Sequence, residues 1–360
     1  MFFPDIKNIL LIQLGDIGDV VWAVPTFWAV KSAYPQARLS LLLREGSACL
    51  VEADPAVDEV IEVRKYRGRL PERWRGQFRF LRDFRSRRFD LVIDLRADER
   101  GAFMARLSGA PYRVAQYYDG LSCWRNPSFT HLVRPAERIT VPAIGAAAQS
   151  LRIVWELGMA APATVPRLWL RPEVSDRVRA LLKEERIGDL SGWCSLNPFS
   201  RWSYKELACG KWVEIIDWLW DEFGMAVVIV GSAAERKKAA ELAAACTGQV
   251  FNLAGRTSLV ELAGVLSLSR LHIGVDSAAP HIAAAVGTAT VTVYGPSDWR
   301  DWAPRGEQHR VIAAEGACVP CHRQGCDNSH VSKCLENLAP ERMKNTLREV
   351  LTAGKMPAKL

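Results

Sequence analysis

A carboxylate with the placement of a general base stands directly after the first apolar run of the chain. Residues 9–14 are largely apolar and are followed by Gly-Asp-Ile-Gly-Asp, which ends at Asp19. Such a run is typical of a strand buried on both faces of a parallel sheet. Asp19 can therefore take a proton from an attacking hydroxyl, or it can cap the helix that follows. A dinucleotide site is disfavoured, because Ile17 and Val20 stand where the G-x-G-x-x-G fingerprint needs glycine.

Cationic and hydroxyl side chains gather in residues 197–212, after another expected strand. Ser200, Arg201 and Lys205 belong to this segment. Groups of this kind at the carboxyl end of a strand are suited to stabilising a diphosphate leaving group. An ordinary polar loop has the same composition, so both interpretations stay open.

A third candidate site is Gly-Val-Asp-Ser-Ala-Ala-Pro-His, residues 274–281, between an expected strand and an expected helix. The free N–H groups at a helix N-terminus can bind a phosphate, and Asp276 and Ser277 stand just before this helix. Either residue can instead serve as a helix cap. His281 can line the same pocket or be a core histidine whose hydrogen bonds are satisfied.

Four cysteines cluster near the C-terminus together with two histidines: Cys318, Cys321, Cys326, Cys334, His322 and His330. The first pair has the C-x2-C spacing of tetrahedral zinc sites, whereas the C-x7-C spacing of the second pair is unusual. Reduced thiols are favoured over disulfides in a cytosolic protein. We expect a structural role, with zinc on one side and free thiols or redox-labile disulfides on the other as the alternatives, and no cofactor for catalysis.

The elements that must position these residues alternate between strands and helices in two halves of the chain. In the first half, strands are expected at 9–14, 39–43, 60–63 and 89–95, and a helix at 20–34. In the second half, strands are expected at 194–198, 226–231, 250–253, 271–275 and 288–295, and helices at 212–223, 235–246, 259–268 and 281–286. This alternation predicts an α/β protein with two doubly wound, Rossmann-like domains.

The expected domains are residues 1–172 and 173–339, followed by a C-terminal helix and tail at 340–360. Ligands of open parallel sheets bind outside the carboxyl ends of the strands. Two such domains therefore predict a central cleft, with a donor bound on one domain and an acceptor on the other.

Composition supports this reading. The 360 residues suffice for two domains, and 49% hydrophobic with 24% charged residues is a soluble, globular balance. No apolar run approaches the roughly 18 residues of a membrane-spanning helix, and the first residues lack the features of a signal peptide. We therefore expect a cytoplasmic protein.

The net charge of +7 is unevenly distributed. Residues 64–88 hold eleven lysines and arginines against Glu72 and Asp83. This stripe is either a solvated surface or a surface for an anionic partner such as a phosphorylated glycolipid or a membrane. Nucleic acid is the least favoured partner, because the chain has neither an RNA-binding aromatic signature nor zinc-finger spacing.

Three segments in this order resemble the ADP-heptose:lipopolysaccharide heptosyltransferases of glycosyltransferase family 9, heptosyltransferase II in particular. They are LLIQLGDIGDVVWAVP at 10–25, NPFSRWSYKELACGKW at 197–212 and HIGVDSAAPHIAAAVGTATVTVYGPSD at 272–298. The resemblance extends over nearly the whole chain. It implies the GT-B fold, with an N-terminal acceptor domain and a C-terminal nucleotide-sugar domain.

The resemblance also implies roles for individual residues. Asp19 would be the general base and Lys205 the partner of the donor diphosphate. The donor pocket would further include Ser200, Arg201, Asp276, Ser277 and His281, with backbone N–H groups near Ala278 and Ala279. On the acceptor side we expect Gln13 and Gly18, together with Arg73, Arg75, Arg79 and Arg82 of the basic stripe.

The chain departs from the family pattern at three places. Gln13 replaces the usual Arg or Lys, Ala278 replaces a glycine, and Leu207-Ala208 replaces Trp-Pro. Because of the last change, Lys211 or Arg201 can share the task of Lys205.

The implied reaction is an inverting transfer of heptose from ADP-heptose to the lipid A–inner core acceptor at the inner face of the inner membrane. Since the chain has no Asp-x-Asp motif, we expect transfer without a metal. The alternatives are a different nucleotide-sugar donor, a non-catalytic nucleotide-sugar-binding protein, and a sugar-nucleotide epimerase.

Overall fold

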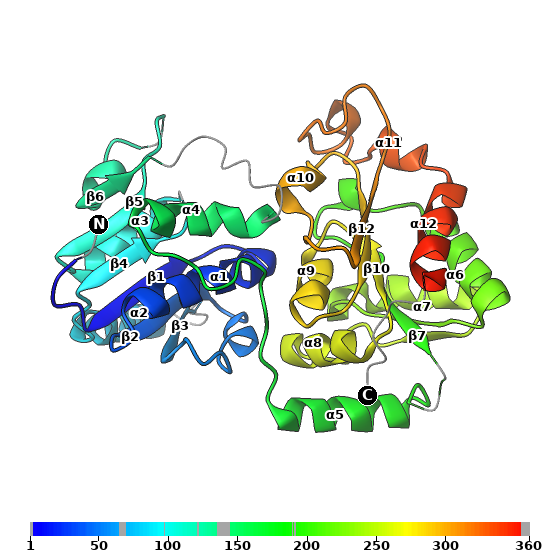
Figure 1. The fold of residues 1–360 in the computed structure, drawn as a ribbon, viewed down its shortest axis with the longest axis horizontal. Coiled ribbons are helices and arrows are strands. Elements are labelled where there is room, and N and C mark those ends of the chain that lie inside the picture. The colour runs from blue at the N-terminus through cyan, green and yellow to red at the C-terminus, as the bar shows by residue number, and fades with distance from the viewer. Residues whose placement is uncertain are drawn as a thin grey trace. The chain divides into compact units, whose positions relative to one another are not determined.

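The computed structural model describes residues 3–64, 70–96, 98–120, 122–134, 145–188, 190 and 192–353. The chain divides into two compact units, Met1–Trp169 and Leu170–Leu360 (Figure 1). The sequence analysis set segment 340–360 apart, and its described residues, 340–353, belong to the second unit.

The first unit alternates strands and helices. Its elements are β1 Asn8–Gln13, α1 Ile17–Ala33, β2 Arg38–Arg44, the 3-10 turn Ala48–Leu50, β3 Glu59–Val63, α2 Leu70–Ser86, β4 Leu91–Asp94, α3 Glu99–Ser108, β5 Tyr112–Gln116, the 3-10 turn Asn126–Ser128, β6 His131–Val133, the 3-10 turn Gly145–Ala147 and α4 Ala148–Glu156.

Six parallel strands form the sheet of this unit, in the order β3-β2-β1-β4-β5-β6. β1 lies between β2 and β4, with Ile12 aligned to Leu42 on one side and to Asp94 on the other. Strands β1, β2 and β3 therefore follow one another toward one edge of the sheet, and β4, β5 and β6 follow one another toward the other edge. The strand order reverses between β1 and β4, and such a position is called the switch point. Sheets of this kind bind ligands there, outside the carboxyl ends of the strands.

The second unit repeats this plan. Its elements are α5 Pro172–Glu184, β7 Trp193–Asn197, the 3-10 turn Ser203–Lys205, α6 Cys209–Phe223, β8 Ala226–Ile229, the 3-10 turn Ala233–Glu235, α7 Arg236–Ala245, β9 Val250–Asn252, α8 Leu259–Leu268, β10 His272–Val275, α9 Ala278–Ala285, β11 Thr290–Tyr294, α10 Trp299–Trp302, β12 His309–Ala313, the 3-10 turn Cys326–Asn328, α11 Lys333–Glu336 and α12 Pro340–Thr352.

The second sheet is also parallel, with the order β12-β11-β10-β7-β8-β9. Its switch point lies between β7 and β10, where Asn197 is aligned with Gly274. The two doubly wound sheets confirm the fold class predicted from the sequence.

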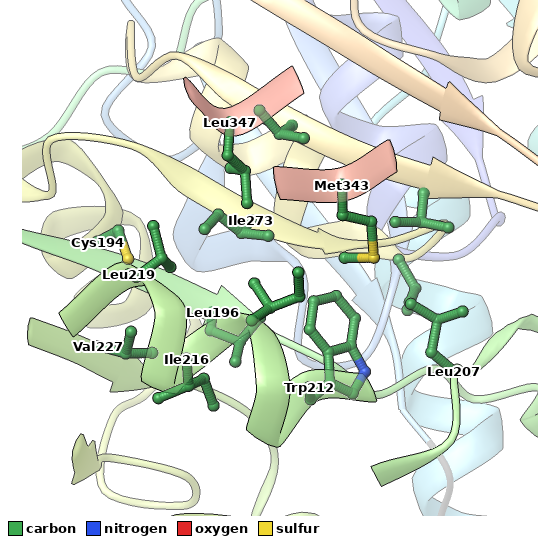
Figure 2. Close-up of a cluster of buried hydrophobic side chains, with 14 of the residues drawn as sticks. Cys194, Leu196, Leu207, Trp212, Ile216, Leu219, Val227, Ile273, Met343 and Leu347 are labelled. Carbon is green, nitrogen blue, oxygen red and sulfur yellow. The ribbon is translucent and has the colours of Figure 1, made fainter. Parts of the chain in front are cut away.

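The last helix is integral to the second unit. Figure 2 shows Met343 and Leu347 of α12 in the same buried cluster as Trp212 of α6, Leu196 of β7 and Ile273 of β10. Burial of each such side chain contributes about 1.5–3 kcal/mol. α12 therefore covers one face of the sheet together with α6.

The helices differ from the sequence-based expectation in several places, and α3, α4, α10 and α11 were not expected at all. α9 begins at Ala278 and not at His281, because Pro280 fits the first turn of a helix, where its missing N–H costs nothing. α5 occupies a segment for which no helix was expected. Its buried Val174, Val178 and Leu182 follow each other at four-residue spacing, which is the pattern of a helix with one apolar face.

Candidate active site

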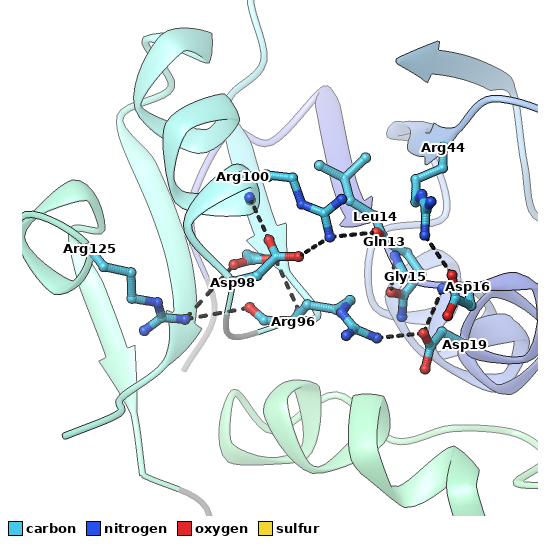
Figure 3. A network of polar contacts seen from close by, with 12 residues as sticks. Gln13, Leu14, Gly15, Asp16, Asp19, Arg44, Arg96, Asp98, Arg100 and Arg125 are labelled. Atoms are coloured by element: carbon cyan, nitrogen blue, oxygen red, sulfur yellow. Dashed lines mark hydrogen bonds and ion pairs between the residues drawn. The ribbon is translucent and has the colours of Figure 1, made fainter. Parts of the chain in front are cut away.

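In the first unit, Asp19 lies at the carboxyl end of β1, beside the switch point. Its Oδ2 accepts a hydrogen bond from the Asp16 backbone N–H at 2.7 Å and an ion pair from Arg96 Nη1 at 2.5 Å (Figure 3). Arg96 follows β4, so this ion pair joins the two strands that flank the switch point. The N-cap of α1 is Asp16, whereas Asp19 is the third helical residue and returns a bond to the cap. A helix-stabilising contact and an ion pair thus share one carboxylate oxygen.

The environment of Asp19 favours a stronger base than a free carboxylate. Burial raises the pKa of Asp19, and the positive charge of Arg96 together with the Asp16 N–H opposes this shift without cancelling it. The side chain still exposes 20% of its surface. A carboxylate with a raised pKa that solvent can reach is suited to accept a proton from a hydroxyl.

Two buried side chains hold the backbone of Arg96 in place. Asp94 Oδ1 accepts from the Arg96 N–H at 3.1 Å, and Arg125 Nη2 donates to the Arg96 carbonyl at 3.5 Å. Asp94 and Arg125 are themselves fully buried and 3.9 Å apart. Asp94 and Arg125 therefore fix the backbone of Arg96, whose side chain pairs with Asp19.

Two of the expected acceptor-side residues are buried. Gln13 Oε1 accepts from the Gly15 N–H at 3.2 Å, so this side chain supports the turn after β1. Gly18 is buried within the first turn of α1. Gly15 itself is needed for close approach, because a Cβ there would lie 2.2 Å from Asp19 Oδ2.

In the second unit, the residues expected to bind the donor meet at the β7/β10 switch point. Lys205 Nζ and Asp276 Oδ2 form an ion pair of 2.6 Å, and both side chains are mostly buried. Ser200 Oγ donates to the Asp276 carbonyl at 3.3 Å. Segments some seventy residues apart in the chain, after β7 and after β10, are thereby brought together.

The N-terminus of α9 opens at the same place. Ser277 is its N-cap residue and donates through Oγ to Asn197 Oδ1 at 3.4 Å, while Ala278 and Ala279 form its first turn. Partial positive charge at a helix N-terminus favours a bound phosphate. A lysine ammonium and a helix N-terminus side by side are suited to a diphosphate.

His281 and Tyr294 lie close to Asp276. Burial lowers the pKa of His281 to about 4, so its imidazole is neutral near pH 7 and can bind a ligand only by hydrogen bonding. Burial also raises the pKa of the Tyr294 phenol, and the Asp276 carboxylate adds to that shift. The sequence analysis did not single out Tyr294, which ends β11 in an apolar run.

Lys211 and Arg201, the alternatives to Lys205, are placed differently. Lys211 Nζ donates to the carbonyls of Leu335, Glu336 and Leu338 and so caps the C-terminal end of α11. Arg201 is exposed, and its guanidinium stacks over the Trp202 ring at 5.4 Å. Lys205 is the cation that pairs with the strand-end carboxylate Asp276.

The cysteine cluster does not form a zinc site in this structure. Among the described residues, no three His, Cys, Asp or Glu side chains lie together so as to hold a metal, and Cys318, Cys321, Cys326 and Cys334 carry free thiols. The zinc alternative from the sequence analysis is therefore not supported.

The cysteine-rich segment instead contacts the loop that carries Lys205. Ser332 Oγ donates to the Tyr204 carbonyl at 2.6 Å, and Ser203 Oγ donates to the His330 carbonyl at 3.3 Å. These bonds hold the 3-10 turn that ends at Lys205. The segment therefore has a supporting place beside the candidate donor site.

The arginines of the basic stripe lie mainly on α2. Arg75, Arg79 and Arg82 are exposed there, whereas the side chain of Arg73 and residues 65–69 of the stripe lie outside the described part of the chain. Within the described part of the chain, no helix has both the length and the apolar composition that are needed to span a membrane.

Two doubly wound units of this kind are the building blocks of the GT-B fold. A glycosyltransferase family 9 structure from Veillonella parvula has a TM-score of 0.80 at 19% identity, covering 97% of this chain and 98% of that chain. The Escherichia coli ADP-heptose lipopolysaccharide heptosyltransferase II structure has a TM-score of 0.76 at 20% identity, covering 96% and 99%. Both similarities establish the fold.

The family follows from the sequence match. The family described as glycosyltransferase family 9 (heptosyltransferase) matches residues 77–332. This chain therefore belongs to glycosyltransferase family 9, as its three segments predicted. It is 27% identical over 292 residues to a lipopolysaccharide heptosyltransferase 3 of E. coli, covering 79% of this chain and 83% of the relative. It is 26% identical to lipopolysaccharide heptosyltransferase 2 of E. coli K12, covering 96% and 98%.

Proposed function

We propose that this glycosyltransferase moves heptose from ADP-heptose to the inner core of lipopolysaccharide, with inversion and without a metal. The observation that carries the proposal is the charged pair at each switch point: Asp19 with Arg96 in the first unit, and Lys205 with Asp276 beside a helix N-terminus in the second. The names of the relatives support the choice of sugar and acceptor. A related E. coli heptosyltransferase has been solved with ADP-2-deoxy-2-fluoro heptose, which supports the choice of donor.

The proposed chemistry is one displacement at the anomeric carbon. Asp19 takes the proton of the acceptor hydroxyl as the acceptor oxygen bonds to that carbon. The bond from the carbon to the diphosphate oxygen breaks, and its electron pair leaves with ADP. Lys205 and the N–H groups of α9 stabilise the negative charge of ADP. A single displacement inverts the anomeric centre and needs only one carboxylate, which is why Asp19 suffices.

Asp276 has a distinct part in this scheme. Without donor, its carboxylate neutralises the Lys205 ammonium. A diphosphate arriving at the α9 N-terminus would compete for that ammonium. We propose that Asp276 keeps Lys205 oriented until the donor takes its place.

The donor assignment is tested by thermal unfolding. A ligand that binds only the folded state at 100 times its Kd stabilises the protein by about 2.7 kcal/mol. ADP-heptose should therefore raise the unfolding midpoint clearly, and UDP- and GDP-hexoses at the same concentration should raise it less. A larger shift with another nucleotide sugar would show that the donor is wrong while leaving the fold and family intact.

Chelation tests the metal-free mechanism. With EDTA present throughout, we expect the initial rate of transfer to stay within about twofold of the untreated rate, because cations of the chain itself would neutralise the leaving group. Immediate loss of activity that magnesium restores would contradict this expectation.

Replacement of Arg96 should change the pH dependence of transfer. The charge of Arg96 lowers the pKa of Asp19 against the larger effect of burial, so Arg96→Gln should raise that pKa further. The base is active when ionised, and ionisation is lost as pH falls through the pKa. The acidic limb of kcat/KM should therefore move to higher pH, with activity retained on the alkaline side. Arg44→Gln, which removes the partner of Asp16, is the matched control and should move the limb less. If Arg96→Gln leaves the acidic limb at the same pH, the group that titrates in this limb is not Asp19.

A further inference from the structure

Two aromatic side chains on α2 are unusually exposed. Trp74 exposes 69% and Phe78 71% of its surface, the largest values among the large hydrophobic side chains of the described residues. They are four residues apart and therefore lie one above the other on a single face of the helix. Single exposed hydrophobic residues are common on protein surfaces, but an exposed pair of large aromatics indicates an interaction surface.

Arginines share this outward face. On a helix of 3.6 residues per turn, Arg75, Arg82 and Arg85 lie within about a quarter turn of Trp74 or Phe78, and Arg79 lies at the edge of the same side. All four are exposed. Arg82 is paired with its neighbour Asp83 at 3.0 Å, and the structure gives no ion pair to the other three within its described part.

The opposite face of α2 is an ordinary core face. Phe84 is fully buried and Phe80 packs beside it against the strands, with their rings 5.9 Å apart. The outward aromatics are therefore not needed to hold the helix on its sheet. On α3, which packs against α2, Phe103 is also exposed, at 53% of its surface.

We infer that the outward face of α2 is a membrane-binding surface, in which Trp74 and Phe78 enter the headgroup region of an anionic bilayer and the arginines bind its phosphates. Tryptophan, whose ring has one polar edge, prefers this depth of a bilayer, phenylalanine inserts as an apolar anchor of interfacial helices, and arginines attract anionic headgroups. The combination of exposed cations, three of them without an ion pair in the described part of the chain, with large exposed aromatics matches an anionic lipid surface in both charge and polarity. The inference goes beyond the transfer reaction and does not depend on it.

The topology gives this surface a use. α2 connects β3 to β4, which are parallel, so the helix runs back from the carboxyl edge of the sheet. Its first turns, which carry Trp74 and Phe78, therefore start from the edge that also carries Asp19. A lipid-borne acceptor held by a bilayer at this edge would present its sugar near the candidate base.

Vesicle sedimentation of the full chain, without donor or acceptor, tests the inference. We expect binding to vesicles of phosphatidylethanolamine and phosphatidylglycerol at low salt, and much weaker binding to phosphatidylcholine. Trp74→Ser with Phe78→Ser should reduce binding about tenfold or more, since two large apolar side chains no longer enter the interface. Replacing Arg75, Arg79 and Arg82 by Gln should reduce it by roughly 100-fold at low salt and by less at high salt.

Matched variants exclude general effects of charge, exposed hydrophobics and folding. Arg179, Lys183 and Lys237 changed together to Gln remove the same charge from exposed positions of the second unit. Trp124→Ser with Leu132→Ser removes two exposed hydrophobics of the first unit outside α2. Both controls should bind vesicles like the unaltered chain, and all variants should keep its unfolding midpoint. If the unaltered chain does not bind anionic vesicles, or if the controls weaken binding as much as the α2 variants, the inference is wrong whatever the outcome for transfer.

Discussion

Asp19→Asn should lower turnover by roughly 100-fold or more while leaving folding and donor binding nearly unchanged. General-base catalysis contributes about this much, and an amide cannot take the proton of the acceptor hydroxyl. Asparagine keeps an oxygen that can accept the Asp16 N–H, so the start of α1 should persist. The measurement is kcat for transfer, accompanied by the unfolding midpoint and the Kd of ADP-heptose.

Asp16→Asn is the matched control for this variant. Asp16 lies in the same loop and is paired with Arg44 at 2.6 Å, but it is an exposed N-cap, a position that asparagine fills equally well. We expect near-normal turnover from the control. If Asp19→Asn also keeps near-normal turnover, or if it loses turnover only because the protein unfolds, Asp19 is no more than a helix-stabilising residue.

Lys205→Ala should weaken ADP-heptose binding by about 10- to 100-fold, which corresponds to one charge-assisted hydrogen bond of about 1.5–3 kcal/mol. It should also lower kcat, because the charge on ADP grows as the bond to the sugar breaks. The alanine leaves Asp276 without its cation, which adds a repulsion against the incoming diphosphate. Isothermal titration with ADP and steady-state kinetics measure the two effects.

Lys211→Ala is the informative comparison. Its ammonium donates to three carbonyls at the end of α11, so its removal should lower the unfolding midpoint and leave donor affinity within a few-fold. Equal losses of donor affinity from Lys205→Ala and Lys211→Ala would show that Lys205 is not the main diphosphate contact.

The sequence predicted the strands around the site well, because each is a short apolar run ending in glycine, proline or a polar residue. The positions of Asp19, Lys205 and Asp276 after their strands follow from that pattern, whereas the outer strands β5, β6 and β12 were not expected. The helices were predicted less completely. α5 was missed because its apolar positions are separated by charged residues, so the segment reads as a linker unless its four-residue period is counted.

The partners of the site residues were not predictable from the sequence. Arg96 stands 77 residues after Asp19, and nothing in the local sequence distinguishes it from other arginines near the strand ends. Only the strand order, which places β4 beside β1, brings the two together. Tyr294 was not predicted either. It is the last residue of β11, and nothing in the sequence of this strand indicates that the tyrosine lies near Asp276. Lys211 shows the converse, because its sequence position suggested the donor and its side chain supports α11.

Mass analysis of the acceptor tests the central claim most directly. The purified chain is mixed with ADP-heptose and a lipid A–inner core acceptor that lacks heptose, and both the acceptor mass and the released ADP are followed. The proposal predicts that the acceptor gains one heptose for each ADP released, and that Asp19→Asn suppresses both together. Release of ADP without a gain in acceptor mass, or a gain from another nucleotide sugar in preference to ADP-heptose, would contradict it.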